Sequence, residues 1–128
     1  MHENRITVRG YEMDSYGHVN NAVYLNYLEQ ARWEILRKID LIEKFKAEGL
    51  LLVVTEIKIR YAQEAKVFDE LNIKTKMMLE GPYILFKHRI ENNGTGEKLV
   101  TADVKTLVIN IDRVPCSVPK EFHNLFDQ

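Results

Sequence analysis

The strongest hydrophobic periodicity in the chain predicts a long amphipathic helix that begins at Asn20 or Asn21. Apolar positions recur at spacings of four, three, four and four, namely Tyr24, Leu28, Ala31, Ile35 and Ile39. This spacing fits a helix of about 3.6 residues per turn, so these side chains form one stripe that packs against a core. Either asparagine can cap the helix, because its side-chain oxygen accepts a hydrogen bond from the free amides of the first turn.

Charged residues lie off this stripe. Side chains separated by three or four positions face each other on a helix. Such pairs are Glu29 with Arg32, and Glu34 with Arg37 or Lys38. We expect Glu29 to pair with Arg32, with contact to a substrate or a partner subunit as the alternative. Asp40 with Glu43 has the spacing of a capping box and predicts a second, shorter helix that ends at Gly49.

Alternation of polar and apolar residues predicts five strands, at 5–9, 55–61, 70–79, 83–91 and 99–111. In the first strand Ile6 and Val8 share one face. In the third the shared face is formed by Leu71, Ile73, Thr75, Met77 and Leu79. The turn sequences GP and NNGTG separate the last three strands. A final short helix, opened by Pro119, is predicted to carry Phe122, Leu125 and Phe126.

This order of elements predicts one α+β domain over residues 1–128, in which an antiparallel β-sheet wraps around a long central α-helix. Such a sheet leaves unpaired backbone groups on its edge strands. Pairing the edges of two copies would satisfy those groups. We therefore expect a homodimer, or a homotetramer built from two dimers.

Composition and charge narrow the class of protein. The chain has 128 residues, of which 45% are hydrophobic and 29% charged, and its formal net charge is −1, as is typical of a soluble globular domain. Its basic residues are dispersed and its apolar runs are short, so neither a nucleic-acid nor a membrane partner is expected. The single cysteine, Cys116, allows no internal disulfide and favours a reducing, cytoplasmic location.

Neither a metal nor a cofactor is expected. The four histidines and the one cysteine lack the short spacings of metal-ligand motifs. The six glycines are isolated and form no phosphate-binding loop. Any catalysis must therefore come from the side chains and backbone of the chain itself.

The stretch DSYGHVNN, at residues 14–21, contains more than a helix start requires. Asp14 lies seven positions before Asn21, where the free amides and the positive dipole end of the long helix begin. Such amides can stabilise the oxyanion formed when a carbonyl carbon is attacked, while a nearby carboxylate activates water or attacks as a nucleophile. Gly17 would let the loop backbone approach a bound substrate closely. The alternative for Asp14 is an Asx-turn that only orders the loop.

The order of elements and this stretch resemble the hotdog fold, and more narrowly the 4-hydroxybenzoyl-CoA thioesterase-like family of acyl-CoA thioesterases. Asp14, Gly17, the segment 18–21 and Tyr24 are similar to the first motif of that family, and residues 59–71 to its later strand, loop and acidic turn. The resemblance covers nearly the whole chain. It implies hydrolysis of an acyl-CoA or acyl-carrier-protein thioester without a metal or a cofactor.

The resemblance also implies roles for individual residues. Asp14 matches the catalytic acid, which is a nucleophile or a general base, and Gly17 matches a glycine of the loop. Asn21 matches the position whose backbone amide contacts the thioester oxygen. His18 matches the histidine of the HVNN version found in plant acyl-carrier-protein thioesterases, but Tyr16 stands where those enzymes have an asparagine. We expect His18 either to order the loop or to contact the substrate.

An apolar face of the helix and sheet is expected to hold the acyl chain, with core packing as the alternative for each residue. The candidates are Tyr24, Leu28, Met77 and Phe86. His88, on a strand, is expected to be structural. Two functions compete with hydrolysis: a hydratase or dehydratase, which resembles an Asp/His pair in a differently placed segment, and a non-catalytic acyl-CoA-binding or regulatory module.

Overall fold

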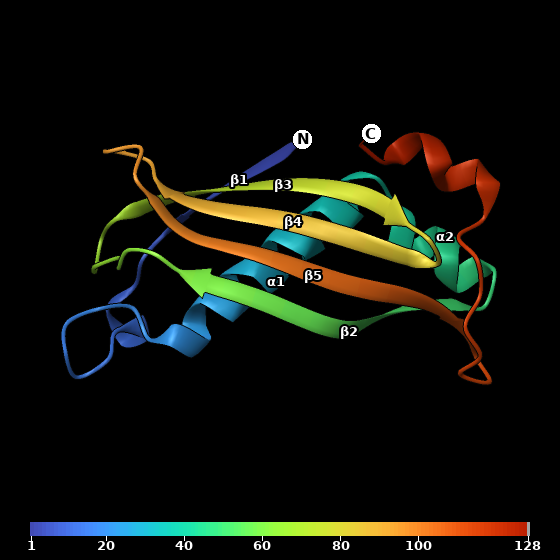
Figure 1. Ribbon diagram of the computed structural model, residues 1–128, viewed down its shortest axis with the longest axis horizontal. Coiled ribbons are helices and arrows are strands. Elements are labelled where there is room, and N and C mark those ends of the chain that lie inside the picture. The colour runs from blue at the N-terminus through green and yellow to red at the C-terminus, as the bar shows by residue number, and fades with distance from the viewer. Residues whose placement is uncertain (128) are drawn as a thin grey trace.

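The computed structural model describes residues 1–127 and has five strands, two α-helices and two 3-10 helices in that range (Figure 1). In chain order these are β1 (His2–Thr7), η1 (Gly10–Glu12), α1 (Asn21–Lys38), α2 (Leu41–Ala47), β2 (Leu50–Tyr61), β3 (Glu70–Glu80), β4 (Tyr83–Asn92), β5 (Lys98–Asn110) and η2 (Lys120–Leu125). Within residues 1–127, no helix is both long enough and apolar enough to cross a membrane.

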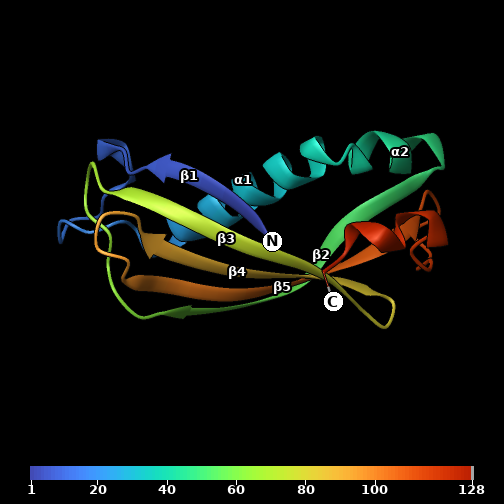
Figure 2. The ribbon, with the colours of Figure 1, turned by 90° about the horizontal axis from the view of Figure 1, so that it is seen from above.

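The strands form one antiparallel sheet in the order β1-β3-β4-β5-β2, so β1 and β2 are its edges. Strands β3, β4 and β5 are neighbours both in sequence and in space, because tight turns join them. Figure 2 shows the sheet curving beneath α1, which lies along one of its faces. The predicted α+β arrangement of a sheet around a long helix is confirmed.

The apolar stripe of α1 packs on the sheet as predicted. Its buried residues include Tyr24, Leu28, Ala31 and Ile35, and of the predicted stripe only Ile39 is less than fully buried. The first half of the helix packs with Leu71, Ile73 and Ile90, and the second half with Met77 and Phe86. The predicted face of β3 is therefore the one that covers the helix.

The ends of the two edge strands differ from the prediction. Strand β1 is His2–Thr7 rather than 5–9, because residues 2–7 pair with β3 from Thr75 to Glu70. Ile6 and Val8 still share the inward side. Strand β2 begins at Leu50 rather than at residue 55, since its apolar start pairs along β5. A bulge between Val54 and Glu56 shifts the register there. The alternation of polar and apolar residues is interrupted at the bulge, so it does not predict the part of the strand before it.

Two local predictions about helices are wrong. Asp40 does not cap α2 with its side chain; it lies in the left-handed region at φ 57°, where it joins two consecutive helices. Glu29 forms no ion pair with Arg32 among the described residues, because Arg32 turns inward from the helix and is buried. The predicted last short helix is confirmed: it is a 3-10 helix with Pro119 as its N-cap and Phe126 as its C-cap, and it buries Phe122.

Candidate active site

The loop from Met13 to Val19 is a narrow turn that presents Asp14 next to the start of α1. Met13 and Val19 form an isolated antiparallel bridge, and the Asp14 amide donates to the His18 carbonyl at 2.7 Å. Gly17 has φ +81°, and a Cβ added there would meet no atom within 4 Å. The turn therefore requires glycine for its backbone conformation rather than for lack of space.

The carboxylate of Asp14 is held by one of its oxygens. Its Oδ1 atom accepts hydrogen bonds from the backbone N–H groups of Tyr16, at 2.8 Å, and His18, at 3.1 Å. The Oδ2 atom has no hydrogen-bond partner among residues 1–127. The Asx-turn expected as the alternative role is thus present, yet it occupies only one oxygen and leaves the other available for chemistry.

His18 links this loop to the segment that follows β2. Its Nε2 atom lies 3.0 Å from Oε2 of Glu64, and both side chains are partly exposed. The structure therefore supports the loop-ordering role of His18, while a contact with substrate stays a prediction. Glu64 was missed in the sequence, because the loop around it has no periodicity to indicate which way its side chain points.

The start of α1 has one capped amide and one free amide. The side-chain oxygen of Asn20 accepts from the Ala22 amide at 2.9 Å, which makes Asn20 the N-cap. The Asn21 amide has no acceptor among residues 1–127. The hydroxyl of Tyr61 donates to the Asn21 carbonyl at 2.9 Å and fixes this peptide. Tyr61 is 45% exposed at this position.

Tyr24 is buried beneath the loop, with 3% of its surface exposed. Its hydroxyl accepts from the Ala65 amide at 2.9 Å, and the Ala65 carbonyl accepts from the Val19 amide at 3.0 Å. Burial raises the pKa of the Tyr24 hydroxyl, and the nearby charges of Glu64 and Asp14 add to this effect. Through these hydrogen bonds Tyr24 and Ala65 hold the end of the loop that carries Asp14. The contact of Tyr24 with substrate stays a prediction.

Glu12 is a second acid close to Asp14, and the sequence did not single it out. It is 5% exposed. Its carboxylate accepts from the Arg9 amide at 2.7 Å, from the Arg9 guanidinium at 2.8 Å and from the Tyr27 hydroxyl at 2.8 Å. Burial, followed by the hydrogen bond and charge of Glu12, raises the pKa of Tyr27. Glu12 therefore anchors the loop and has no oxygen free for a reaction.

Farther along α1, a buried polar group joins the helix to the sheet. Nη1 of Arg32 lies 3.3 Å from Nε2 of His88, and Nδ1 of His88 lies 2.8 Å from Oγ1 of Thr75. Because arginine only donates, His88 accepts at Nε2 and carries its proton on Nδ1, which donates to Thr75. Burial, reinforced by the charge of Arg32, lowers the pKa of His88 to about 3. His88 is therefore a neutral structural residue, as expected.

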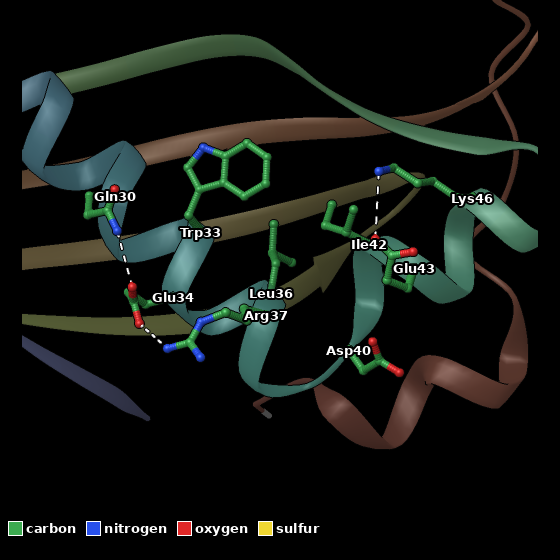
Figure 3. A pocket seen from close by; sticks show the side chains of 9 residues that line it. All are labelled: Gln30, Trp33, Glu34, Leu36, Arg37, Asp40, Ile42, Glu43 and Lys46. Carbon is green, nitrogen blue, oxygen red and sulfur yellow. Dashed lines mark hydrogen bonds and ion pairs between the residues drawn. The ribbon is translucent and has the colours of Figure 1, made fainter.

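A cavity of about 500 Å³ lies between α1 and α2, with the side chains of Trp33, Leu36 and Ile42 along its wall (Figure 3). The ion pair of Glu34 with Arg37, at 2.7 Å, is at its rim. Asp14 does not line this cavity. The volume of the cavity is therefore no evidence that the cavity takes part in a reaction at Asp14. Met77 and Phe86, expected as candidates to hold the acyl chain, are both fully buried, and Phe86 also lines a smaller cavity beside Arg32. No group of three or more potential metal ligands occurs within the described residues.

Comparison with known proteins identifies the family. The thioesterase-like superfamily matches residues 8–126. FadM from Escherichia coli K12, a long-chain acyl-CoA thioesterase, is 36% identical over 111 residues, which are 86% of this chain and 83% of FadM. The acyl-CoA thioesterase YbgC from Haemophilus influenzae is 32% identical over 122 residues, covering 89% of this chain and 88% of YbgC.

Solved structures agree. The probable thioesterase YbaW from Escherichia coli superposes with a TM-score of 0.88 at 31% identity, covering 95% of this chain and 93% of YbaW. A 12:0-ACP thioesterase from Umbellularia californica has a TM-score of 0.90 at 14% identity, covering 99% of this chain and 54% of that one, and it shows the fold alone. The chain belongs to the thioesterase-like superfamily and has the hotdog fold. It is a thioester hydrolase, which confirms the class predicted from the sequence.

Proposed function

We propose that the protein hydrolyses acyl-CoA thioesters, with Asp14 as the catalytic carboxylate and the Asn21 amide as the oxyanion donor. Two relatives that are more than 30% identical over most of this chain, FadM and YbgC, are acyl-CoA thioesterases. The observation that carries the residue assignment is a carboxylate with one oxygen unbonded among residues 1–127, on a loop that leads directly to a helix amide without an acceptor in that range.

Asp14 is suited to either of two reaction paths. Its Oδ1 atom is fixed by two backbone amides, so the direction of the free Oδ2 atom is set before substrate binds. As a general base, Oδ2 takes a proton from water, and the resulting hydroxide attacks the thioester carbon. As a nucleophile, it attacks that carbon itself and forms a mixed anhydride, which water then hydrolyses. The thiolate leaves readily in both, so no strong general acid is required.

The first turn of α1 supplies the complementary charge. The helix has 18 residues, and its N-terminus is equivalent to about half a positive charge. The free Asn21 amide can donate to the oxyanion as the carbonyl becomes tetrahedral. The hydrogen bond from Tyr61 to the Asn21 carbonyl holds the neighbouring peptide in place. Gly17 and His18 shape the loop between the carboxylate and this amide.

Asp14→Asn tests the assignment, because it keeps an oxygen that can accept the two amides but removes the basic, nucleophilic one. We expect thiol release from acyl-CoA to fall by about 100-fold or more. Asp69→Asn is the matched control, since Asp69 is also a loop aspartate that accepts a backbone amide, from Lys66 at 2.9 Å. Full activity in a folded Asp14→Asn protein would rule out the role of Asp14.

An acyl-carrier-protein thioester is the second candidate substrate. The acyl-acyl carrier protein thioesterase ATL3 from Arabidopsis thaliana is 28% identical over 135 residues, covering 99% of this chain and 70% of ATL3. Thiol release from matched acyl-CoA and acyl-carrier-protein substrates decides between the carriers. Thermal stabilisation by acyl-CoA without any thiol release would instead indicate a binding module.

We infer a homodimer that forms through β2, in keeping with the open edges of the sheet. Four of the large apolar side chains of this edge strand are 39–48% exposed: Leu51, Val54, Ile57 and Tyr61. An exposed edge with apolar side chains favours pairing with another chain. Val54→Lys is expected to shift the protein toward a monomer in size-exclusion chromatography with light scattering, whereas Lys58→Ala on the same strand should not.

A further inference from the structure

Arg32 is a buried cation for which the described residues provide no carboxylate. It is 9% exposed, and its one hydrogen bond within residues 1–127 is that of Nη1 to Nε2 of His88 at 3.3 Å. No aspartate or glutamate within residues 1–127 lies within ion-pair distance of it. Burial lowers the pKa of Arg32, but a guanidinium stays protonated in proteins. A positive charge is therefore held inside the molecule, and within residues 1–127 the carboxylate that acts on it, that of Glu29, lies beyond ion-pair distance.

The hydrogen-bonded neighbour of Arg32, His88, cannot neutralise that charge. His88 is 4% exposed, accepts at Nε2 and donates through Nδ1 to Thr75 at 2.8 Å. The imidazole is neutral, and both of its nitrogens are hydrogen-bonded. Among residues 1–127 the other N–H groups of Arg32 have no acceptor, so they can donate to one from outside the chain. A planar guanidinium with free N–H groups matches the geometry of a carboxylate.

Arg32 borders a cavity of about 170 Å³ between α1 and the strands β2, β4 and β5. Most of its wall is apolar and is formed by Trp33, Leu36, Ile42, Leu52, Val54 and Phe86. The polar lining also includes Glu29 and Thr106, and the Thr106 hydroxyl already donates to the Ile84 carbonyl at 2.7 Å. The cavity therefore combines a mostly apolar wall with one cationic group.

The cavity lies along the same side of α1 as the amide proposed to bind the oxyanion. Arg32 is 11 positions after Asn21, which is three turns and about 16 Å along the helix, on nearly the same face. Strand β2 approaches this side of α1 at two places: the Tyr61 hydroxyl donates to the Asn21 carbonyl, and Leu52 and Val54 line the cavity. The rise of about 16 Å from Asn21 to Arg32 is comparable with the length of an extended chain of about twelve carbons.

We propose that Arg32 binds a carboxylate at the far end of the acyl group, so that the preferred substrates are CoA thioesters of medium-length dicarboxylic acids. This proposal rests on the proposed thioesterase function. The diacid supplies a counter-ion to a guanidinium that is only 9% exposed and that borders a mostly apolar cavity. A plain fatty acyl chain would place its methyl end against an unpaired charge.

Binding of the free acids tests the subsite without requiring turnover. Dodecanedioate and dodecanoate are the probes, because their length approximates the distance from Asn21 to Arg32. Titration calorimetry is expected to show at least tenfold tighter binding of dodecanedioate to the wild type and no preference in Arg32→Met. Arg37→Met is the matched control, since Arg37 is an exposed arginine on the same helix, and it should keep the preference. Equal binding of both acids to the wild type would overturn the proposal.

Glu29 provides an independent variant on the same cavity. Its carboxylate lines the cavity and competes for the guanidinium, so Glu29→Gln is expected to tighten dodecanedioate binding severalfold without changing dodecanoate binding. Arg32→Lys covers the case in which Arg32→Met does not fold. It keeps the charge but loses the planar pair of donors, so the diacid preference should fall at least threefold. An undiminished preference in Arg32→Lys would count against the proposal.

Hydrolysis separates this proposal from the general function. The wild type should release thiol from dodecanedioyl-CoA with a kcat/KM at least tenfold above that for dodecanoyl-CoA, and Arg32→Met should reverse the order. Hydrolysis that favours dodecanoyl-CoA would overturn the Arg32 subsite while leaving the thioesterase intact. Tight dodecanedioate binding with no hydrolysis of any thioester would overturn the thioesterase function and leave the subsite.

Discussion

Glu12 and Asp14 are two acids on one short segment, and their surroundings are opposite. Glu12 is buried, and its carboxylate accepts three hydrogen bonds, two from Arg9 and one from Tyr27. Asp14 is half-buried, and only its Oδ1 atom is occupied. A fully bonded carboxylate stabilises a fold, whereas a carboxylate with a fixed and a free oxygen is prepared for a reaction. The comparison predicts that the two acids affect different measurements.

The largest effect is expected on catalysis at Asp14. Asp14→Asn should lower kcat/KM by about 100-fold, which is about 2.7 kcal/mol of transition-state stabilisation, with little change in the unfolding free energy. The rate of thiol release measures the change in kcat/KM, and urea denaturation of the same preparation measures the change in the free energy of unfolding. A variant that loses stability as much as activity would place Asp14 with Glu12 as a structural acid.

Glu12→Gln should have the converse result. The side-chain nitrogen of the new glutamine cannot accept a hydrogen bond from the Arg9 guanidinium. The charge-assisted hydrogen bond between Arg9 and Glu12 is therefore lost. We expect a loss of about 1–3 kcal/mol in the unfolding free energy, measured by urea denaturation. Activity per folded molecule should stay within a few-fold of the wild type at low temperature. A large fall in kcat of folded protein would mean that Glu12 takes part in the reaction.

A smaller, pH-dependent effect is expected at His88, another buried and fully bonded group. Its pKa is about 3 in the folded chain, against 6.5 when it is free. Between those values the unfolded state binds the proton and the folded state does not, so stability falls as the pH falls from 6.5 toward 3. The slope is at most about 1.4 kcal/mol per pH unit.

Urea denaturation from pH 7 to pH 4 measures that slope. The slope of stability against pH should decrease in His88→Gln. It should persist in His123→Gln, the control, because His123 is exposed. An unchanged slope in His88→Gln would mean that other groups dominate the acid sensitivity of the fold.

The smallest effect concerns the ion pair of His18 with Glu64. Both partners are partly exposed, so the pair is worth less than about 1 kcal/mol. If His18 only orders the loop, His18→Gln and Glu64→Gln should lower kcat/KM by the same small factor, within about threefold. A much larger loss of kcat/KM in His18→Gln alone would show that His18 contacts the substrate, which is the alternative role expected from the sequence.

Much of the fold follows from local pattern. The stripe from Tyr24 to Ile35, the alternating face of β3 and the Asn20 cap were predictable, because helix and strand periods determine which side chains share a face. Position-specific predictions failed where several contacts compete. The bulge at Val54, the left-handed Asp40 and the inward turn of Arg32 depend on partners far away in the sequence.

The sequence by itself determined the class of protein: a single long helix with a curved antiparallel sheet, and an acid, a glycine and a capped helix start in one short stretch. Only the tertiary structure decided the state of each polar group. It paired Glu64 with His18, Tyr61 with Asn21 and Arg32 with His88, and it satisfied Glu12 completely while leaving one oxygen of Asp14 free. The reason is physical: periodicity reports which face a residue lies on, but the hydrogen bonds that remain open depend on which distant segments the fold brings against it.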